Sequence, residues 1–262
     1  MCKVISIINQ KGGVAKTTTV YAISDCLAKK GKRVLMIDFD PQSSLTVLAG
    51  FEEIDQMTHT ITDLMSHAMA KRESLEFDYD IKELRNGVSF IPANKELAAI
   101  EVSLTNVMSR EYVLSDVLEQ LKSAYDYIII DCSPSLSLLT INALAASDSI
   151  IIPVTAEYLS AKGLEMLLET VLRIKKRINP QLEIEGILFT KFKARNRLTK
   201  AVVKMTTDAY GGVIPIFEPT IAHSTKVAQT AMYHKSIVEY APKHKSAQAY
   251  IQVVEEILAN EK

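Results

Sequence analysis

An apolar run near the amino terminus leads directly into a short segment of glycines and lysines, and this junction constrains the fold more than any other feature. The run covers residues 4–8, and the segment after it reads NQKGGVAKTTT over 9–19. Because Gly12 and Gly13 have no Cβ atoms, successive backbone N–H groups can turn inward and form an anion-binding nest at the start of a helix. Strand, glycine loop and helix in this order predict a phosphate-binding loop in an α/β fold.

The side chains of this loop suit a nucleoside triphosphate. We expect Lys16 to reach the β- and γ-phosphates and the Thr17 hydroxyl to coordinate a Mg²⁺ ion that bridges them. The strict pattern G-x-x-x-x-G-K-[ST] is not met, because Gln10 and Ala15 stand where it has glycines. The alternative is an ordinary Gly-Gly turn with Lys16 in solvent.

Composition and charge limit the class of protein. The chain has 262 residues, of which 48% are hydrophobic and 23% charged, as in a soluble globular protein with a large core. The formal net charge of −1 excludes a globally basic nucleic-acid binder but leaves local basic patches open. Cys2, Cys26 and Cys132 lack C-x-x-C spacing, which favours reduced thiols in a cytoplasm, and the histidines have no metal-ligand spacing.

The pattern of elements predicts one α/β domain over 1–262, with a mostly parallel twisted sheet and helices on both faces. Strands are expected over 3–9, 33–38, 88–91, 127–131, 149–153 and 183–190. A first helix carries Val20, Ile23 and Leu27 at helical spacing, and others are expected near 95–104, 111–123, 138–146, 160–178, 197–209 and 245–260. Residues 51–80 are expected to be mostly helical. We expect neither a membrane span nor a signal peptide.

Three aspartates are expected at the carboxyl edge of the sheet, where ligands bind in open α/β folds. Asp38 and Asp40 end an apolar strand and are separated by one residue, so the period of two points both the same way. Asp131 ends another apolar strand and is expected to reach the magnesium through a water. Asp40-Pro41 can also be read as a plain turn.

The loop resembles that of the ParA/MinD family, the deviant Walker A ATPases, whose pattern K-G-G-x-x-K-T-[ST] corresponds to residues 11–18. The resemblance covers nearly the whole chain and implies ATP and Mg²⁺ as cofactors. It implies that Lys11 crosses a dimer interface to the phosphates held by the other subunit. A merely solvated Lys11 is the alternative. Ala15 and Ser133 depart from the glycine and proline that many relatives have.

The resemblance also implies roles for single residues. Asp40 would orient the attacking water, and Asp38 would support the loop and the metal shell. Thr190 and Pro215 would hold the base, although both also fit a strand end and a turn. The predicted nucleotide-binding residues are Lys11, Gly12, Gly13, Val14, Ala15, Lys16, Thr17, Thr18, Thr190 and Pro215. Lys11, Lys16 and Asp40 are the predicted catalytic residues.

A basic segment, defined as residues 191–204, carries six positive charges and no acid. Such charge suits sequence-independent binding of DNA phosphates, although a solvated helix face is the alternative. The resemblance implies a DNA-binding face that includes positions 195 and 226. The predicted DNA-binding residues are Lys193, Arg195, Arg197, Lys200 and Lys226. We expect no helix-turn-helix extension before the first strand.

The expected function is that of a ParA-type partition ATPase, cytoplasmic and associated with the nucleoid. ATP would close a sandwich dimer that binds DNA without sequence preference, and a ParB-like partner would stimulate hydrolysis and release, driving plasmid or chromosome segregation. One alternative is a MinD-like membrane-cycling ATPase, which the acidic carboxyl end disfavours because anionic lipid attracts basic faces. Another is a nucleotide-gated scaffold that positions a different cargo.

Overall fold

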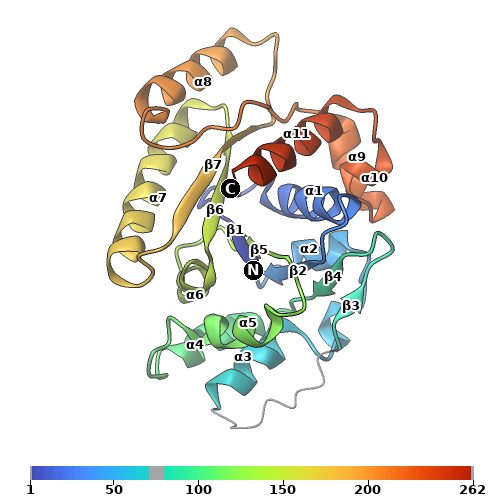
Figure 1. The fold of residues 1–262 in the computed structure, drawn as a ribbon, viewed down its shortest axis with the longest axis vertical. Helices are drawn as coiled ribbons and strands as arrows, with labels where there is room; N and C mark the ends of the chain where they lie inside the picture. The colour runs from blue at the N-terminus through green and yellow to red at the C-terminus, as the bar shows by residue number, and fades with distance from the viewer. Residues whose placement is uncertain (1, 71–79, 261–262) are drawn as a thin grey trace.

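The computed structural model describes residues 2–70 and 80–260, which build a seven-stranded sheet between two layers of helices (Figure 1). The strands run in the order β3-β4-β2-β5-β1-β6-β7, and every neighbouring pair is parallel except β3 with β4. Their bounds are Lys3–Ile7 (β1), Val34–Phe39 (β2), Lys82–Glu83 (β3), Ser89–Ile91 (β4), Tyr127–Cys132 (β5), Ser149–Thr155 (β6) and Glu183–Thr190 (β7). The prediction of a mostly parallel sheet is confirmed.

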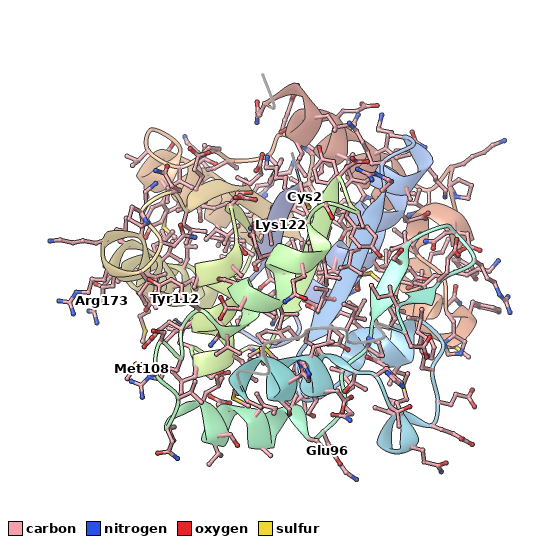
Figure 2. The ribbon with its side chains drawn as sticks, turned by 60° about the horizontal axis from the view of Figure 1, so that its bottom comes forward. Cys2, Glu96, Met108, Tyr112, Lys122 and Arg173 are labelled. Atoms are coloured by element: carbon pink, nitrogen blue, oxygen red, sulfur yellow. The ribbon has the colours of Figure 1, made fainter. Side chains whose placement is uncertain are left out.

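Helices cover both faces of the sheet. One layer contains α3 (Ile61–Met69), α4 (Leu97–Leu104), α5 (Val113–Leu121), α6 (Leu138–Ala146) and α7 (Tyr158–Arg177), and α8 (Arg197–Tyr210) lies beside α7. The other contains α1 (Lys16–Lys29), α2 (Ser44–Leu48), α9 (Thr225–Tyr233), α10 (Ile237–Tyr240) and α11 (Lys245–Ala259). The Tyr112 hydroxyl donates to the Ile178 carbonyl over 3.0 Å and ties the segment before α5 to the end of α7 (Figure 2).

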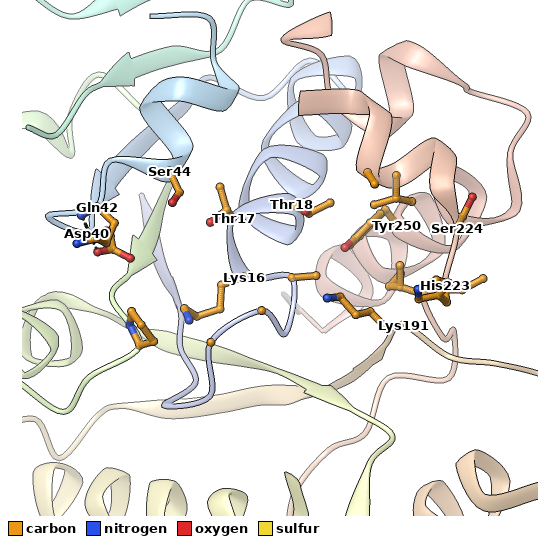
Figure 3. Close-up of a pocket in the computed structure, with 18 residues that line it drawn as sticks. Lys16, Thr17, Thr18, Asp40, Gln42, Ser44, Lys191, His223, Ser224 and Tyr250 are labelled. Atoms are coloured by element: carbon orange, nitrogen blue, oxygen red, sulfur yellow. Dashed lines mark hydrogen bonds between the residues drawn. The ribbon is translucent and has the colours of Figure 1, made fainter. Parts of the chain in front are cut away.

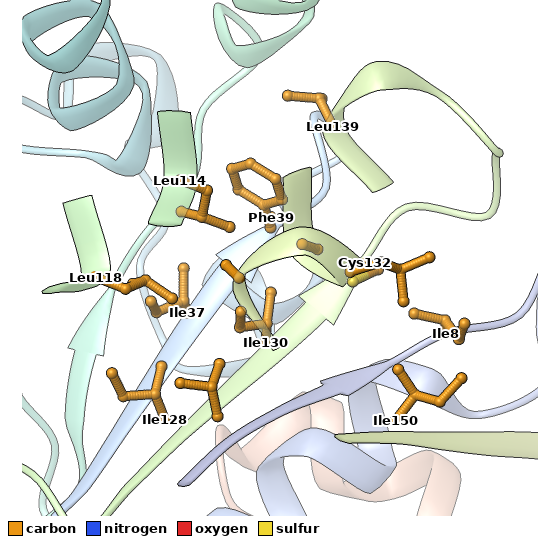
Figure 4. Close-up of a cluster of buried hydrophobic side chains, with 14 of the residues drawn as sticks. Ile8, Ile37, Phe39, Leu114, Leu118, Ile128, Ile130, Cys132, Leu139 and Ile150 are labelled. Atoms are coloured by element: carbon orange, nitrogen blue, oxygen red, sulfur yellow. The ribbon is translucent and has the colours of Figure 1, made fainter. Parts of the chain in front are cut away.

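The central strands are apolar on both faces, as parallel strands buried under two helical layers must be. In β2, Leu35 and Ile37 join the core cluster under α3–α7, whereas Val34 and Met36 join the cluster under α1 and α11. Figure 4 shows the first cluster, where Ile37 and Ile130 of neighbouring strands lie under Leu114 of α5.

The alternation of side chains between the two faces of the sheet also sets the direction of the two buried aspartates. Asp38 follows Met36 with the period of two, and Asp131 follows Ile129, so both carboxylates project toward the layer that contains α1. They are also direct partners in the register of β2 with β5. Two strands therefore deliver acids to one place, beside the first turn of α1.

Some elements were absent from the sequence-based prediction. These are α2, β3, α9 and α10. In α9 only Thr230 is buried, so no apolar stripe marks it as a helix. The stretch expected to be mostly helical contains α3, which starts at a Thr60/Asp63 capping box, while its part over 71–79 lies outside the described residues.

The last described helix belongs to the core. Val253, Val254 and Ile257 of α11 are fully buried, and Tyr250 shares a hydrogen bond of 3.0 Å with Thr19 of α1. Figure 1 shows α11 lying alongside α1. Its apolar side is therefore already occupied. Within the described ranges, no helix has the length and apolar character needed to cross a bilayer.

Candidate nucleotide-binding site

The loop between β1 and α1 is held in place by contacts with β6, which lies next to β1, and with β7, which lies next to β6. The Asn9 side chain donates to the Pro153 carbonyl of β6 over 2.7 Å and accepts from the Lys11 backbone N–H over 2.9 Å. The Thr190 hydroxyl at the end of β7 donates to the Val14 carbonyl over 2.9 Å. Groups distant in sequence thus fix the loop before any ligand binds.

Two residues of the loop have left-handed backbone conformations. Gly13 has φ 72° and Ala15 has φ 70°. The glycine adopts this region freely, whereas an L-residue with a Cβ atom pays about 1–2 kcal/mol there. The departure from glycine at position 15 therefore leaves the nest geometry intact and adds strain to it.

Replacing Ala15 with glycine should raise the free energy of unfolding by about 0.5–1 kcal/mol, because the relief of strain exceeds the greater entropy of glycine in the unfolded chain. Thermal denaturation should show a rise in Tm of about 1–4 °C. Ala28→Gly in the helical part of α1 is the matched control and should lower Tm. An Ala15→Gly variant that is less stable than the wild type would show that position 15 carries no strain.

Lys16 and Asp131 form the buried centre of the site. Lys16 is 8% exposed, and its Nζ donates to the Asn9 carbonyl over 3.2 Å. Burial lowers the pKa of Lys16, against the opposing effect of Asp131. Burial and then the neighbouring Asp38 raise the pKa of Asp131, against a hydrogen bond from the Thr17 side chain.

The groups beside Thr17 fit a magnesium ion. The Oδ1 atom of Asp131 is buried and has no hydrogen-bond partner among the described residues, which is uncommon for a carboxylate oxygen in a protein interior. A hard cation that keeps several waters and phosphate ligands takes one or two such oxygens. Asp131 and the Thr17 hydroxyl are therefore the side chains that would hold a nucleotide-bound magnesium ion here.

Asp38 and Asp40 occupy different positions although they are two residues apart. Asp38 is fully buried and accepts from Thr46 N–H (2.8 Å), from the Thr46 hydroxyl (2.7 Å) and from Asp40 N–H (3.2 Å). Burial raises the pKa of Asp38 to about 7, against these hydrogen bonds. Asp40 is partly exposed, and its Oδ1 accepts from Gln42 N–H over 3.0 Å. Asp38 thus holds the backbone of Asp40 in place from behind.

A cavity of about 550 Å³ opens over the loop (Figure 3), a volume typical of small-molecule sites. The predicted residues that line it are Gly12, Gly13, Ala15, Lys16, Thr17, Thr18 and Asp40. The lining does not include Lys11, Val14, Asp38 or Asp131.

The two residues predicted to hold the base, Thr190 and Pro215, do not line the cavity either. Thr190 is buried behind the loop, and the Pro215 carbonyl accepts from Ile187 N–H over 2.9 Å in an extension of the sheet.

The wall opposite Asp40 comes from parts of the chain to which the sequence-based prediction gave no role in nucleotide binding. Lys191, His223, Ser224 and Tyr250 line this end of the cavity (Figure 3). Lys191 directly follows β7. Because ligands bind at the carboxyl ends of parallel strands, its position after a strand could have predicted that it lines the site. No comparable signal marks Ser224 or Tyr250, which reach the cavity only through the packing of α9 and α11.

Lys11 is engaged outside this cavity. Its ammonium is ion-paired with Glu157, at the start of α7, and lies 3.5 Å from the Thr155 hydroxyl. Its side chain is 38% exposed. The hydrogen bond from Lys11 and the charge of Lys11 lower the pKa of Glu157. The two lysines of the loop therefore have different environments, Lys16 inside the site and Lys11 at its outer edge.

The predicted DNA-binding residues lie on the surface. Lys193 and Arg195 precede α8, whose first residue is Arg197, and all three are exposed, as are Lys200 and Lys226. Arg197, Lys200 and Lys204 recur at the spacing of one helical face. Within the described part of the chain, none of these side chains forms a salt bridge. These five basic side chains are therefore exposed positive charges.

The chain is similar to known proteins over nearly its full length. A family model described as an AAA domain matches residues 2–184. The sporulation initiation inhibitor protein Soj of Bacillus subtilis is 38% identical over 99% of this chain and 100% of its own length. The chromosome partitioning protein ParA of Caulobacter vibrioides is 33% identical over 99% of this chain and 95% of its own length. The chain belongs to this AAA-domain family and is a P-loop ATPase of the ParA/MinD type.

Solved structures share the fold over almost the full chain. Cobyrinic acid a,c-diamide synthase from Mycobacterium smegmatis, with bound ADP and magnesium, is 32% identical with a TM-score of 0.85 and covers 99% of this chain and 95% of its own. A putative plasmid partition protein from Borrelia burgdorferi bound to AMPPNP is 26% identical with a TM-score of 0.80 and covers 99% of this chain and 100% of its own.

Proposed function

We propose that the protein is an ATP-dependent DNA-partitioning ATPase of the ParA type. The observation that carries this proposal is the cavity that brings the phosphate loop and Asp40 together, while the second lysine of the loop, Lys11, lies outside it. Relatives named as Soj and as chromosome partitioning ParA support the biological role.

ATP with Mg²⁺ is the proposed ligand. The N–H groups of the loop and Lys16 would bind the phosphates, and Thr17 and Asp131 would face the metal, whose charge offsets that of the phosphates. Asp40 would orient the attacking water or accept its proton, because it is the carboxylate that lines the cavity across from Lys16. Asp38 would keep Asp40 in position through the Asp40 N–H group.

We propose that ATP closes a dimer in which Lys11 contacts the nucleotide of the partner subunit. Replacing Lys11 with alanine should abolish the ATP-dependent dimer while nucleotide binding to the monomer is retained, since Lys11 is not part of its own cavity. Light scattering coupled to size-exclusion chromatography, with a slowly hydrolysed ATP analogue, measures this. Lys122→Ala, which removes a partly exposed lysine paired with Glu119, is the control. Equal dimer formation in the Lys11→Ala variant would contradict a role in trans.

The basic segment and Lys226 are proposed to bind DNA phosphates without sequence preference, which would associate the protein with the nucleoid. A ParB-like partner is proposed to stimulate hydrolysis and release. The alternative of a membrane-cycling ATPase gains no support from α11, whose apolar side is buried against α1.

A further inference from the structure

Ser224 occupies a defined position on the cavity wall. It directly precedes α9 and lies at the end of the cavity opposite Asp40, near His223 and Tyr250 (Figure 3). Its segment is tied to the chain after β7, because Phe192 N–H donates to the Ile221 carbonyl over 2.9 Å and His223 N–H donates to the Phe192 carbonyl over 3.0 Å. The position of Ser224 relative to the phosphate loop is thus set by the sheet.

The His244 ring fixes the direction of the hydrogen bonds at Ser224. The Nδ1 atom of His244 accepts from Ser246 N–H over 3.2 Å and caps the start of α11. A neutral imidazole that accepts at Nδ1 carries its proton on Nε2, and Nε2 lies 3.2 Å from the Ser224 hydroxyl oxygen. Burial, and then the charges of Lys226 and Lys245, lower the pKa of His244, which favours the neutral ring. His244 therefore donates to Ser224.

Ser224 receives a second hydrogen bond, from Lys226 N–H over 3.2 Å, as the cap of α9. A hydroxyl oxygen has two acceptor lone pairs and one hydrogen, so two incoming hydrogen bonds leave only the donor function. Ser224 lines the cavity, where a bound molecule can accept that hydrogen.

We propose that Ser224 donates a hydrogen bond to an acceptor atom of the nucleoside half of the bound nucleotide, and that His244 is the positioning residue that sets this donor. The inference rests on the proposed function. The phosphates belong at Gly12, Gly13 and Lys16, with Asp40 at one end, so the base and ribose extend toward the opposite wall (Figure 3). Ring nitrogens of the base and oxygens of the ribose are acceptors of the required kind.

Titration calorimetry with Mg-ADP and, separately, with inorganic pyrophosphate tests the role of Ser224 in the full chain. Ser224→Ala should weaken ADP binding by roughly 3- to 10-fold, the effect of one hydrogen bond, and leave pyrophosphate binding unchanged. Ser224→Thr retains the hydroxyl and should bind ADP as the wild type does. Wild-type ADP affinity in Ser224→Ala, or an equal loss for pyrophosphate, would overturn the inference.

The His244→Asn variant separates two roles of His244, the capping of α11 and the positioning of the Ser224 hydroxyl. The shorter amide can still accept from Ser246 N–H, so Tm should stay at the wild-type value, but it does not reach Ser224. ADP affinity should fall as in Ser224→Ala, and the double variant should show no further loss. Full additivity of the two effects would overturn the role of His244. A wild-type chain that binds no ADP would instead contradict the proposed function itself.

Discussion

Replacing Asp40 with alanine should leave ATP binding intact and lower ATP turnover by about 100-fold or more, which is the contribution expected of a group that positions water or accepts its proton. Asp40 lines the cavity, whereas Asp38 and Asp131 are buried behind it. Phosphate release measures turnover, and calorimetry with Mg-ATP measures binding. Asp208→Ala, which removes an exposed carboxylate of α8, should leave both unchanged.

Asp40→Asn distinguishes catalysis from a plain turn at Asp40-Pro41. The asparagine side chain retains an oxygen that accepts from Gln42 N–H, so the turn should persist, but its amide is no base and carries no charge. We expect the asparagine variant to be nearly as slow as the alanine variant. Normal turnover in Asp40→Asn would show that position 40 serves the turn and that another group acts on the water.

Replacing Arg195 with glutamate should lower the affinity for non-specific duplex DNA by about tenfold or more at about 0.1 M salt, because the change removes one phosphate contact and adds a repelling charge. The slope of log affinity against log salt should decrease in magnitude by about 1. Fluorescence anisotropy with an ATP analogue present, over a series of salt concentrations, gives both quantities. Basal ATP turnover should not change, since Arg195 is exposed and is not among the residues that line the cavity.

The control for the DNA-binding measurement is an arginine-to-glutamate change elsewhere on the surface. Arg173 of α7 is 77% exposed and pairs weakly with Glu169, with the nearest charged atoms 3.7 Å apart (Figure 2). Arg173→Glu alters the net charge equally but lies outside the basic segment, so DNA affinity should remain close to that of the wild type. DNA binding that keeps its strength and salt dependence in Arg195→Glu would remove the basic segment from the proposed function.

Most of the residues that the sequence predicts to bind phosphate line the cavity, and their contact with phosphate stays a prediction. Gly13 and Ala15 take the left-handed conformations that a nest requires, and Lys16 lies at the first turn of α1. The base side was not predicted in the same way. Thr190 was predicted to hold the base, yet its hydroxyl supports the loop from behind, and the cavity is lined instead by the next residue, Lys191.

The class of fold, the glycine loop between β1 and α1 and the aspartates at the sheet edge could be predicted from the sequence alone. These depend on residues adjacent in the chain, through backbone conformation and the period of two along a strand. The residues that close the cavity and the ion pair of Lys11 became visible only in the folded chain. Ser224 joins His244 from another element, and Lys11 meets Glu157 across the sheet edge, 146 residues along the chain. Such contacts follow from the packing of distant elements, which no local pattern encodes.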